Sequence, residues 1–212
     1  MKITRNCIEE ESFKIIDDLM GNPAISPEEK EIRSRITHAA GDTDLYWKIA
    51  ISKTAADASE MALKSKCNII TDSRMVEAGI RKKWLAENGN KYFCAIDRED
   101  IFRESDKTGK TRAALSMRSL AEYLPGSIAV LGNAPTALFE LLSICKEDEK
   151  LKPSLIIGIP VGFVGAADSK SCLSAQSGMP FITLPGTRGG SNLASAVFNA
   201  LINIFIMRKS AD

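Results

Sequence analysis

The chain has little histidine, little cysteine and almost no net charge: one histidine, five cysteines and a formal charge of +1 in 212 residues. A balanced charge gives no overall field that would recruit nucleic acid, so an anionic ligand must be bound by local charges. The cysteines are scattered and form no C-x-x-C pair, which argues against a disulfide framework or a cysteine zinc site. A single histidine cannot form a histidine-rich metal site. We therefore expect a cytoplasmic protein with no metal centre and no nucleic-acid partner.

Long apolar runs are also missing. No uninterrupted run reaches the roughly 18 residues of a membrane-spanning helix. Charged residues at positions 2, 5 and 9–11 interrupt the N-terminus, so we expect neither a signal peptide nor a membrane partner. Hydrophobic residues make up 44% and charged residues 26% of the chain, which is the balance of a globule with a real core. Without repeats or a long linker, residues 1–212 are predicted to form one domain.

Strand-like and helix-like segments alternate along most of the chain. Strands are predicted at residues 47–51, 68–71, 92–96, 127–131, 155–159 and 180–184. Helices are predicted at residues 54–64, 73–78, 111–123, 134–146, 167–175 and 191–207. This alternation is typical of a doubly wound α/β fold, in which helices cover both faces of a mostly parallel sheet.

The first 40 residues are predicted to be a helical segment. Ser26 and Pro27 are a strong helix start, with Ser as the N-cap and Pro as the first helical residue. This helix should stop at Gly41. The longest polar stretch, residues 98–110, is predicted to be a mobile surface loop over the site.

Three connections between a strand and the following helix stand out, at residues 131–136, 158–165 and 185–191. Each follows the carboxyl end of a predicted strand, where ligands bind in open α/β sheets. The last connection places Arg188 and several small-residue amides at a helix N-terminus, which is a natural seat for a carboxylate or phosphate.

Two nucleotide-binding motifs are nearly present, and both fail. A G-x-G-x-x-G motif ending at Gly165 needs glycine where Pro160 stands. A phosphate loop ending in Gly109-Lys110-Thr111 needs glycine where Glu104 stands, and that carboxylate would repel a phosphate. A nucleotide-dependent α/β enzyme stays an alternative that these motifs disfavour.

The single histidine, His38, lies in the last turn of the predicted helix before Gly41. The carbonyl end of the helix dipole favours the imidazolium form there. Asp42 and Asp44 act in the same direction, whereas Arg35 opposes it. A proton-bearing histidine is suited to general-acid catalysis. The alternative is an ordinary surface or core histidine without a catalytic role.

Several motifs together resemble one known family. They are Ser12-Phe13, Arg35-Ile-x-His38, Thr71-Asp72 with Met75, Thr111-Arg112, residues 132–139, residues 160–167 and Gly189-Gly190-Ser191. The chain is similar, nearly end to end, to precorrin-8X methylmutase and its cobalt-precorrin-8 counterpart. The resemblance implies a Rossmann-like homodimer that moves a methyl group from C-11 to C-12 of a corrin precursor in cobalamin biosynthesis. Such a rearrangement implies no cofactor, and the family's catalytic general acid falls on His38.

The resemblance and the charge of a corrinoid substrate together indicate a set of binding residues. The expected substrate-binding residues are Ser12, Arg35, Asp72, Met75, Thr111, Arg112, Asn133, Gly162, Phe163, Lys170, Arg188, Gly190 and Ser191. The arginines, Lys170 and the helix start at Gly190 are the expected partners of substrate carboxylates. For Arg35 the alternative is an ion pair with Glu31, four residues earlier on the same helix face. Asp168 stands where the family usually has glutamate.

Other interpretations remain open at this point. A corrinoid carrier without catalytic activity would bind the same ligand and would not need a proton donor. Residues 186–192 and 42–47 favour the cobalt-containing form of the substrate. Transient contact with neighbouring enzymes of the pathway is a further expectation.

Overall fold

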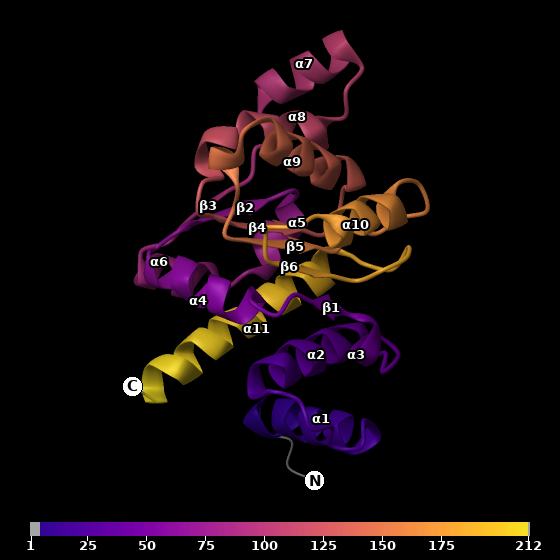
Figure 1. Ribbon diagram of the computed structural model, residues 1–212, viewed down its shortest axis with the longest axis vertical. Coiled ribbons are helices and arrows are strands. Elements are labelled where there is room, and N and C mark those ends of the chain that lie inside the picture. The colour runs from indigo at the N-terminus through magenta and orange to yellow at the C-terminus, as the bar shows by residue number, and fades with distance from the viewer. Residues whose placement is uncertain (1–4, 212) are drawn as a thin grey trace.

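The computed structural model describes residues 5–211, with side chains for residues 8–210, so the charged position 2 lies outside the described residues. The described chain contains one six-stranded sheet with helices on both sides (Figure 1). The strands are β1 (Ala50–Ile51), β2 (Asn68–Thr71), β3 (Lys91–Phe93), β4 (Ile128–Leu131), β5 (Leu155–Gly158) and β6 (Phe181–Thr183). Strand β1 is antiparallel to β6, and all other neighbours are parallel.

The helices take up most of the remaining chain. The α-helices are α1 (Arg5–Leu19), α2 (Pro27–Ala40), α3 (Leu45–Lys48), α4 (Ala55–Lys64), α5 (Arg74–Gly79), α6 (Lys82–Asn88), α7 (Glu99–Thr108), α8 (Arg112–Ser119), α9 (Pro135–Glu147), α10 (Ala166–Ala175) and α11 (Ser191–Ala211). Two short 3₁₀ turns, η1 (Ala121–Tyr123) and η2 (Glu149–Leu151), complete the list.

The strand order is β1-β6-β5-β4-β2-β3, which confirms a mixed α/β fold with a mostly parallel sheet. Numbered among themselves, the five parallel strands have the order 2-1-3-4-5. This is the order of flavodoxin-type doubly wound sheets rather than the 3-2-1-4-5-6 order of dinucleotide-binding domains. The direction of winding reverses between β2 and β4, and ligands bind beyond the strand ends at such a point.

Two hydrophobic cores lie on opposite faces of the sheet. Neighbouring residues of β2, Ile69 and Ile70, belong to different cores because side chains alternate along a strand. The core that contains Ile69 also contains residues of α2, α4 and α11, whereas the Ile70 core contains residues of α8, α9 and α10. Figure 1 shows these two helical layers on either side of the strands.

The predicted strand at residues 47–51 is wrong for its first part. Residues up to Lys48 form α3, and only Ala50 and Ile51 pair with β6. The aromatic and branched residues here favoured a strand. Tertiary contacts decide otherwise, because the buried Arg33 guanidinium donates to the carbonyls of Tyr46 and Ile49 at the end of this turn.

The predicted loop at residues 98–110 is also wrong, since most of it forms α7. Two acidic residues, Glu99 and Asp100, occupy the first turn, and Gly109 ends the helix in the left-handed conformation with φ 71°. One side chain, Ile101, is buried beneath the polar surface. The predicted helix at 111–123 ends at Ser119, followed by the turn η1, and α6 was not predicted.

Helix α11 is long and apolar enough to cross a membrane by length and composition, with a mean hydropathy of 1.2 over its best window. Of that window, 61% is buried inside the protein. Its side chains Val197, Phe198 and Leu201 are fully buried in the core shared with α2 and α4. The apolar composition is therefore that of a central core helix.

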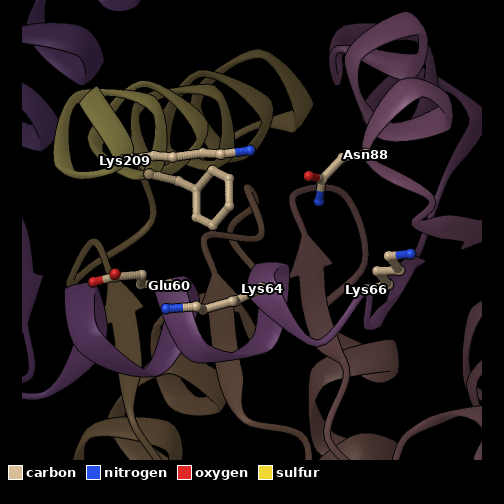
Figure 2. A pocket seen from close by; sticks show the side chains of 6 residues that line it. Glu60, Lys64, Lys66, Asn88 and Lys209 are labelled. Carbon is tan, nitrogen blue, oxygen red and sulfur yellow. The ribbon is translucent and has the colours of Figure 1, made fainter. Parts of the chain in front are cut away.

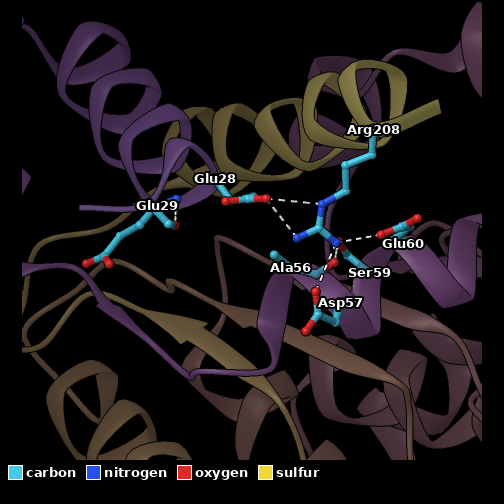
Figure 3. Close-up of polar contacts among 8 residues, drawn as sticks. Glu28, Glu29, Ala56, Asp57, Ser59, Glu60 and Arg208 are labelled. Carbon is cyan, nitrogen blue, oxygen red and sulfur yellow. Dashed lines mark hydrogen bonds and ion pairs between the residues drawn. The ribbon is translucent and has the colours of Figure 1, made fainter. Parts of the chain in front are cut away.

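Arg208 fastens the end of α11 to two other helices. Its guanidinium lies 2.9 Å from a Glu28 oxygen on α2, and 2.9 Å and 2.5 Å from oxygens of Asp57 and Glu60 on α4. Figure 3 shows the three carboxylates arranged around this one cation. Contact with Arg208 lowers the pKa of the Glu28 carboxyl.

Candidate active site

His38 lies at the carbonyl end of α2, in the place that the sequence predicts. The Ser26 hydroxyl accepts from the Glu29 N–H at 3.1 Å and fixes the start of the helix. Gly41, with φ 63°, ends the helix and donates its N–H to the His38 carbonyl at 3.3 Å. The imidazole is exposed, so it is accessible to a ligand.

A hollow of about 210 Å³ lies beside the imidazole. Its lining residues are Ser12, Ile15, Ile16, Thr37, His38, Gly41, Asp42 and Thr43. The Phe13 ring of α1 meets the imidazole edge to face, with 5.4 Å between ring centroids. Of the predicted binding residues, Ser12 shares this hollow, although its hydroxyl donates to the Ile8 carbonyl at 2.7 Å.

Arg188 brings a second predicted element to the same place. Its guanidinium forms an ion pair with Asp42, which lines the His38 hollow. This contact, with a hydrogen bond from the Asp44 N–H, holds the pKa of the Asp42 carboxyl below its usual value. The rim of the hollow therefore carries a carboxylate whose charge is compensated by an arginine.

The guanidinium of Arg35 is occupied within the protein. It lies 3.1 Å from a Glu31 oxygen, forms a second ion pair with Glu9 and stacks on the Phe13 ring at 4.5 Å. The ion pair with Glu31 is the alternative that the sequence offered for this residue. A role of Arg35 in substrate binding stays a prediction, and its visible role is to dock α1 on α2.

Asp72 follows β2 at the reversal point of the sheet, and its carboxylate binds backbone. It accepts N–H groups of Gly132, Asn133 and Ala134 at 3.2, 2.8 and 2.8 Å. Burial raises the pKa of the Asp72 carboxyl, and the three N–H donors oppose that rise. Asp72 thus joins the end of β2 to the start of α9. The side chains of Met75 and Asn133 are exposed, and their contacts with substrate stay predictions.

The two glycine-rich loops after β5 and β6 touch each other. Gly162 donates to the Thr187 carbonyl at 3.1 Å, and Gly190 donates to the Ile159 carbonyl at 3.0 Å. A Cβ on Gly189 would lie 2.4 Å from the Ile159 carbonyl oxygen, so only glycine allows this approach. The loops form one platform at the carboxyl edge of the sheet.

The platform has an exposed apolar side chain, Phe163, at one end, here called its tip, and a buried hydroxyl, Ser191, at the other. Phe163 is 94% exposed at the tip, and its predicted contact with substrate stays a prediction. At the other end, the Ser191 hydroxyl at the start of α11 lies 3.3 Å from the Ser73 hydroxyl. Ser191 is buried, so its predicted contact with substrate stays a prediction.

Lys170 lies beneath the platform rather than on it. Its side chain is buried, and its ammonium donates to the Arg188 carbonyl at 2.6 Å. Burial lowers the pKa of Lys170 to about 8. This buried placement disfavours the predicted direct contact between Lys170 and a substrate carboxylate.

Thr111 and Arg112 lie on the other side of the sheet. The Thr111 hydroxyl accepts from the Ala114 N–H at 3.3 Å and lies 2.8 Å from the Thr136 hydroxyl. The Arg112 guanidinium carbon lies 4.4 Å from the centre of the Phe102 ring of α7. Thr111 lines a separate hollow of about 560 Å³ between α8 and α9. Figure 1 shows α8 and α2 in opposite layers, so one chain does not bring Arg112 to His38.

Another hollow, of about 290 Å³, lies between the ends of α4, α6 and α11 (Figure 2). Lys64 and Lys209, which line it, belong to the last turns of α4 and α11, where cations balance the carbonyl ends of helices. Figure 2 shows Lys209 extended across the opening toward Asn88. None of the predicted site residues lines this hollow. Within residues 8–210, no three side chains of His, Cys, Asp or Glu gather as metal ligands.

Comparison with known proteins decides the family. The family model described as precorrin-8X methylmutase matches residues 7–204. The chain belongs to the precorrin-8X methylmutase family. It is 38% identical over 202 residues to a cobalt-precorrin-8 methylmutase of Leptospira interrogans, covering 92% of this chain and 91% of that protein. It is 40% identical over 185 residues to a precorrin-8X methylmutase of Pseudomonas aeruginosa, covering 87% and 86%.

Solved structures agree with this assignment. A precorrin-8X methylmutase from Thermus thermophilus superposes with a TM-score of 0.85 and 31% identity, covering 95% of this chain and 98% of that one. A precorrin-8X methylmutase related protein gives a TM-score of 0.80 and 34% identity over 89% and 97%. This precorrin-8X methylmutase family member is therefore a methyl-shifting isomerase of cobalamin biosynthesis.

Two hydroxyl side chains that line the His38 hollow, Thr37 and Thr43, were not predicted from the sequence. Thr37 precedes His38 on α2, and Thr43 follows the helix end at Gly41. Both residues lie within five positions of His38 in the sequence, and this closeness to the proposed acid is the signal that could have identified them.

Proposed function

We propose that this enzyme moves a methyl group from C-11 to C-12 of precorrin-8, with His38 as the general acid. The observation that supports this most strongly is the placement of the single histidine, exposed beside a hollow at the carbonyl end of α2. The compensated Asp42 lies on the same rim.

In this mechanism the imidazolium protonates the nitrogen of ring C in the macrocycle. Protonation makes the acceptor carbon electron-poor and so lowers the barrier to migration. The bond from the methyl group to C-11 breaks as the bond to C-12 forms, and the proton then returns to His38. Substrate and product contain the same atoms, so the reaction consumes no methyl donor and no redox equivalent.

The rest of the corrinoid needs more room and more cations than the His38 hollow provides. At about 210 Å³ the hollow is below the roughly 300–1,000 Å³ of ordinary ligand pockets. Helix α8, which begins at Arg112 and has Thr111 as its N-cap, lies in the opposite layer of the same chain. We infer that a homodimer completes the site, with the exposed Phe163 tip near the boundary between the two copies. A cytoplasmic location and a cobalt-containing substrate belong to the same proposal.

The direct test compares wild type with His38→Ala on purified precorrin-8, in its cobalt-free and cobalt-containing forms. Product would be followed by its absorbance, with mass spectrometry confirming an unchanged mass. The variant should lose about 10²–10⁴-fold in the rate of the bound complex, the usual contribution of a general acid. Product should still bind, because the binding groups are elsewhere.

The outcomes separate the proposal from its alternatives. Rearrangement by His38→Ala within about threefold of wild type, a trivial change in barrier, would remove His38 as the acid. Tight corrinoid binding without any conversion by wild type would favour a carrier. A faster bound reaction as His38 loses its proton would mean that it acts as a base.

A further inference from the structure

Lys170 is a charged side chain that the proposed mechanism does not use. It is 1% exposed and is among the largest fully buried side chains in the described chain. Removing an ammonium from water costs several kcal/mol unless it is paired. Burial is the one cause of its lowered pKa, with no contribution from a carboxylate. Because burial of the Lys170 ammonium costs free energy of folding, we expect this side chain to have a specific role.

The one hydrogen bond of the Lys170 ammonium in the described structure is to the backbone of Arg188, at 2.6 Å. A charged donor makes this a stronger hydrogen bond than a neutral donor would. Arg188 is therefore held at both ends: its carbonyl accepts from Lys170, and its guanidinium pairs with Asp42. Asp42 in turn lines the His38 hollow.

The residues on either side of Arg188 are held by other hydrogen bonds, so the Arg188 backbone depends on Lys170. On one side, the Thr187 carbonyl accepts from Gly162 at 3.1 Å. On the other, Gly190 donates to the Ile159 carbonyl at 3.0 Å. Both bonds fix the loop to the β5 connection, and neither involves Arg188 itself.

We propose that Lys170 is a positioning residue, whose buried ammonium holds the Arg188 backbone so that the guanidinium of Arg188 stays on Asp42 at the rim of the His38 hollow. This role of Lys170 takes the place of the direct substrate binding expected from the sequence, and it rests on the proposed function of the hollow. Its effect on catalysis is electrostatic. Without the arginine, the Asp42 carboxylate would face an anionic corrinoid uncompensated and would repel it.

A measurement without substrate tests the geometry. The pKa of Asp42 would be read by ¹³C NMR titration of its carboxyl carbon in wild type, Lys170→Met and Arg188→Ala. Arg188→Ala should raise the Asp42 pKa toward the ordinary value of about 3.9. Lys170→Met should raise it in the same direction, and the double variant should add nothing to Arg188→Ala. Lys48, which also lowers the Asp42 pKa, is unchanged in all of these proteins.

Matched variants keep this test interpretable. Ser171→Ala changes an exposed neighbour on α10 and should leave the Asp42 pKa at its wild-type value. Lys170→Met replaces the buried ammonium with an apolar side chain of similar length and so removes the cost of burying a charge that no carboxylate pairs, and the variant should fold. Lys170→Gln is the second variant, and it should behave like Lys170→Met if the ammonium is what matters.

Kinetics then connect the geometry to the reaction. In Lys170→Met, KM should rise about two- to fivefold, the range of a partly exposed ion pair, with kcat within about twofold of wild type. The same substitution in an Arg188→Ala background should leave KM unchanged. An Asp42 pKa that stays at its wild-type value in both Lys170 variants, while Arg188→Ala raises it, would overturn the proposal. Failure of wild type to rearrange precorrin-8 would instead count against the proposed function and leave the NMR result standing.

Discussion

The ring of Phe13 on α1 meets the imidazole of His38 on α2 edge to face, with 5.4 Å between centroids. The same ring lies under the guanidinium of Arg35, 4.5 Å from its carbon. The Phe13 ring thus packs against both the proposed acid, His38, and the guanidinium of Arg35, which pairs with Glu9 of α1. This relationship links the N-terminal helix to the chemistry of the hollow.

Replacing Phe13 by alanine should slow the methyl shift about two- to tenfold, since an aromatic pair contributes about 0.5–1.5 kcal/mol beyond its buried area. The loss should appear mainly in kcat, because the imidazole loses its lateral support while the binding groups remain. Steady-state rates with precorrin-8 would measure it. Ile8→Ala, at an exposed site on the same helix, is the matched control and should have wild-type kinetics. An unchanged kcat in Phe13→Ala would show that the imidazole needs no support from α1.

Replacing Arg112 by alanine should weaken substrate binding by one to two decades, as expected from the loss of a charge-assisted bond of roughly 1.5–3 kcal/mol. The structure adds a competing role, because Arg112 stacks on Phe102 of α7. Binding would be measured by absorbance titration, and unfolding by urea. Phe102→Leu tests the stacking alone and should lower stability without changing affinity. Wild-type affinity of Arg112→Ala at low salt would assign this residue to structure.

Much of the fold can be predicted from the sequence, because the buried strands are short apolar runs that alternate with helical segments. The failures have physical causes. Residues 47–51 have strand composition, yet Arg33, far from them in the sequence, donates to the carbonyls of Tyr46 and Ile49 and supports a helical turn. Residues 98–110 look polar enough for a loop. They form a helix because acidic residues stabilise its first turn, Gly109 ends it, and burial of Ile101 alone anchors it to the core.

The candidate site shows a similar limit. The position of His38 follows from local signals, a strong N-cap and a glycine stop on α2. The partners of charged side chains do not, because they depend on chain segments far apart in the sequence. Asp72 bonds to backbone 60 residues later, and Lys170 bonds to the Arg188 carbonyl. The family resemblance identifies Asp72 and Lys170 as candidate site residues but does not predict which groups they contact.

Replacing Arg208 by alanine should destabilise the protein through the end of α11. Three carboxylates, Glu28, Asp57 and Glu60, would lose their shared cation, and like charges would face one another across α2 and α4. A loss of roughly 1–2 kcal/mol in the free energy of unfolding is expected for such a network, and added salt should reduce it. Arg103→Ala, at an exposed 4.0 Å pair on α7, should change stability by less than about 0.5 kcal/mol. Equal losses in the two variants at low salt would contradict a special role for Arg208.

The buried Lys170 should give stability a distinct pH dependence. Its folded pKa is about 8, below the roughly 10.4 of an exposed lysine, so between these values the unfolded chain binds more protons than the folded one. The free energy of unfolding should therefore rise as pH increases through this window, and the full burial cost is present below pH 8. The size of the rise is roughly 2–4 kcal/mol, at about 1.4 kcal/mol for each pH unit.

Urea unfolding of wild type and Lys170→Met across this window isolates the effect. Buried thiols oppose it, because burial raises the pKa of Cys67 to about 12 and of Cys145 to about 11, but both variants share them and the difference cancels their contribution. The stability of wild type relative to Lys170→Met should climb with pH, whereas Lys53→Met, at an exposed site, should run parallel to wild type. Parallel curves for wild type and Lys170→Met would mean that the Lys170 ammonium is solvated in solution, since a group with the same pKa in both states contributes no slope.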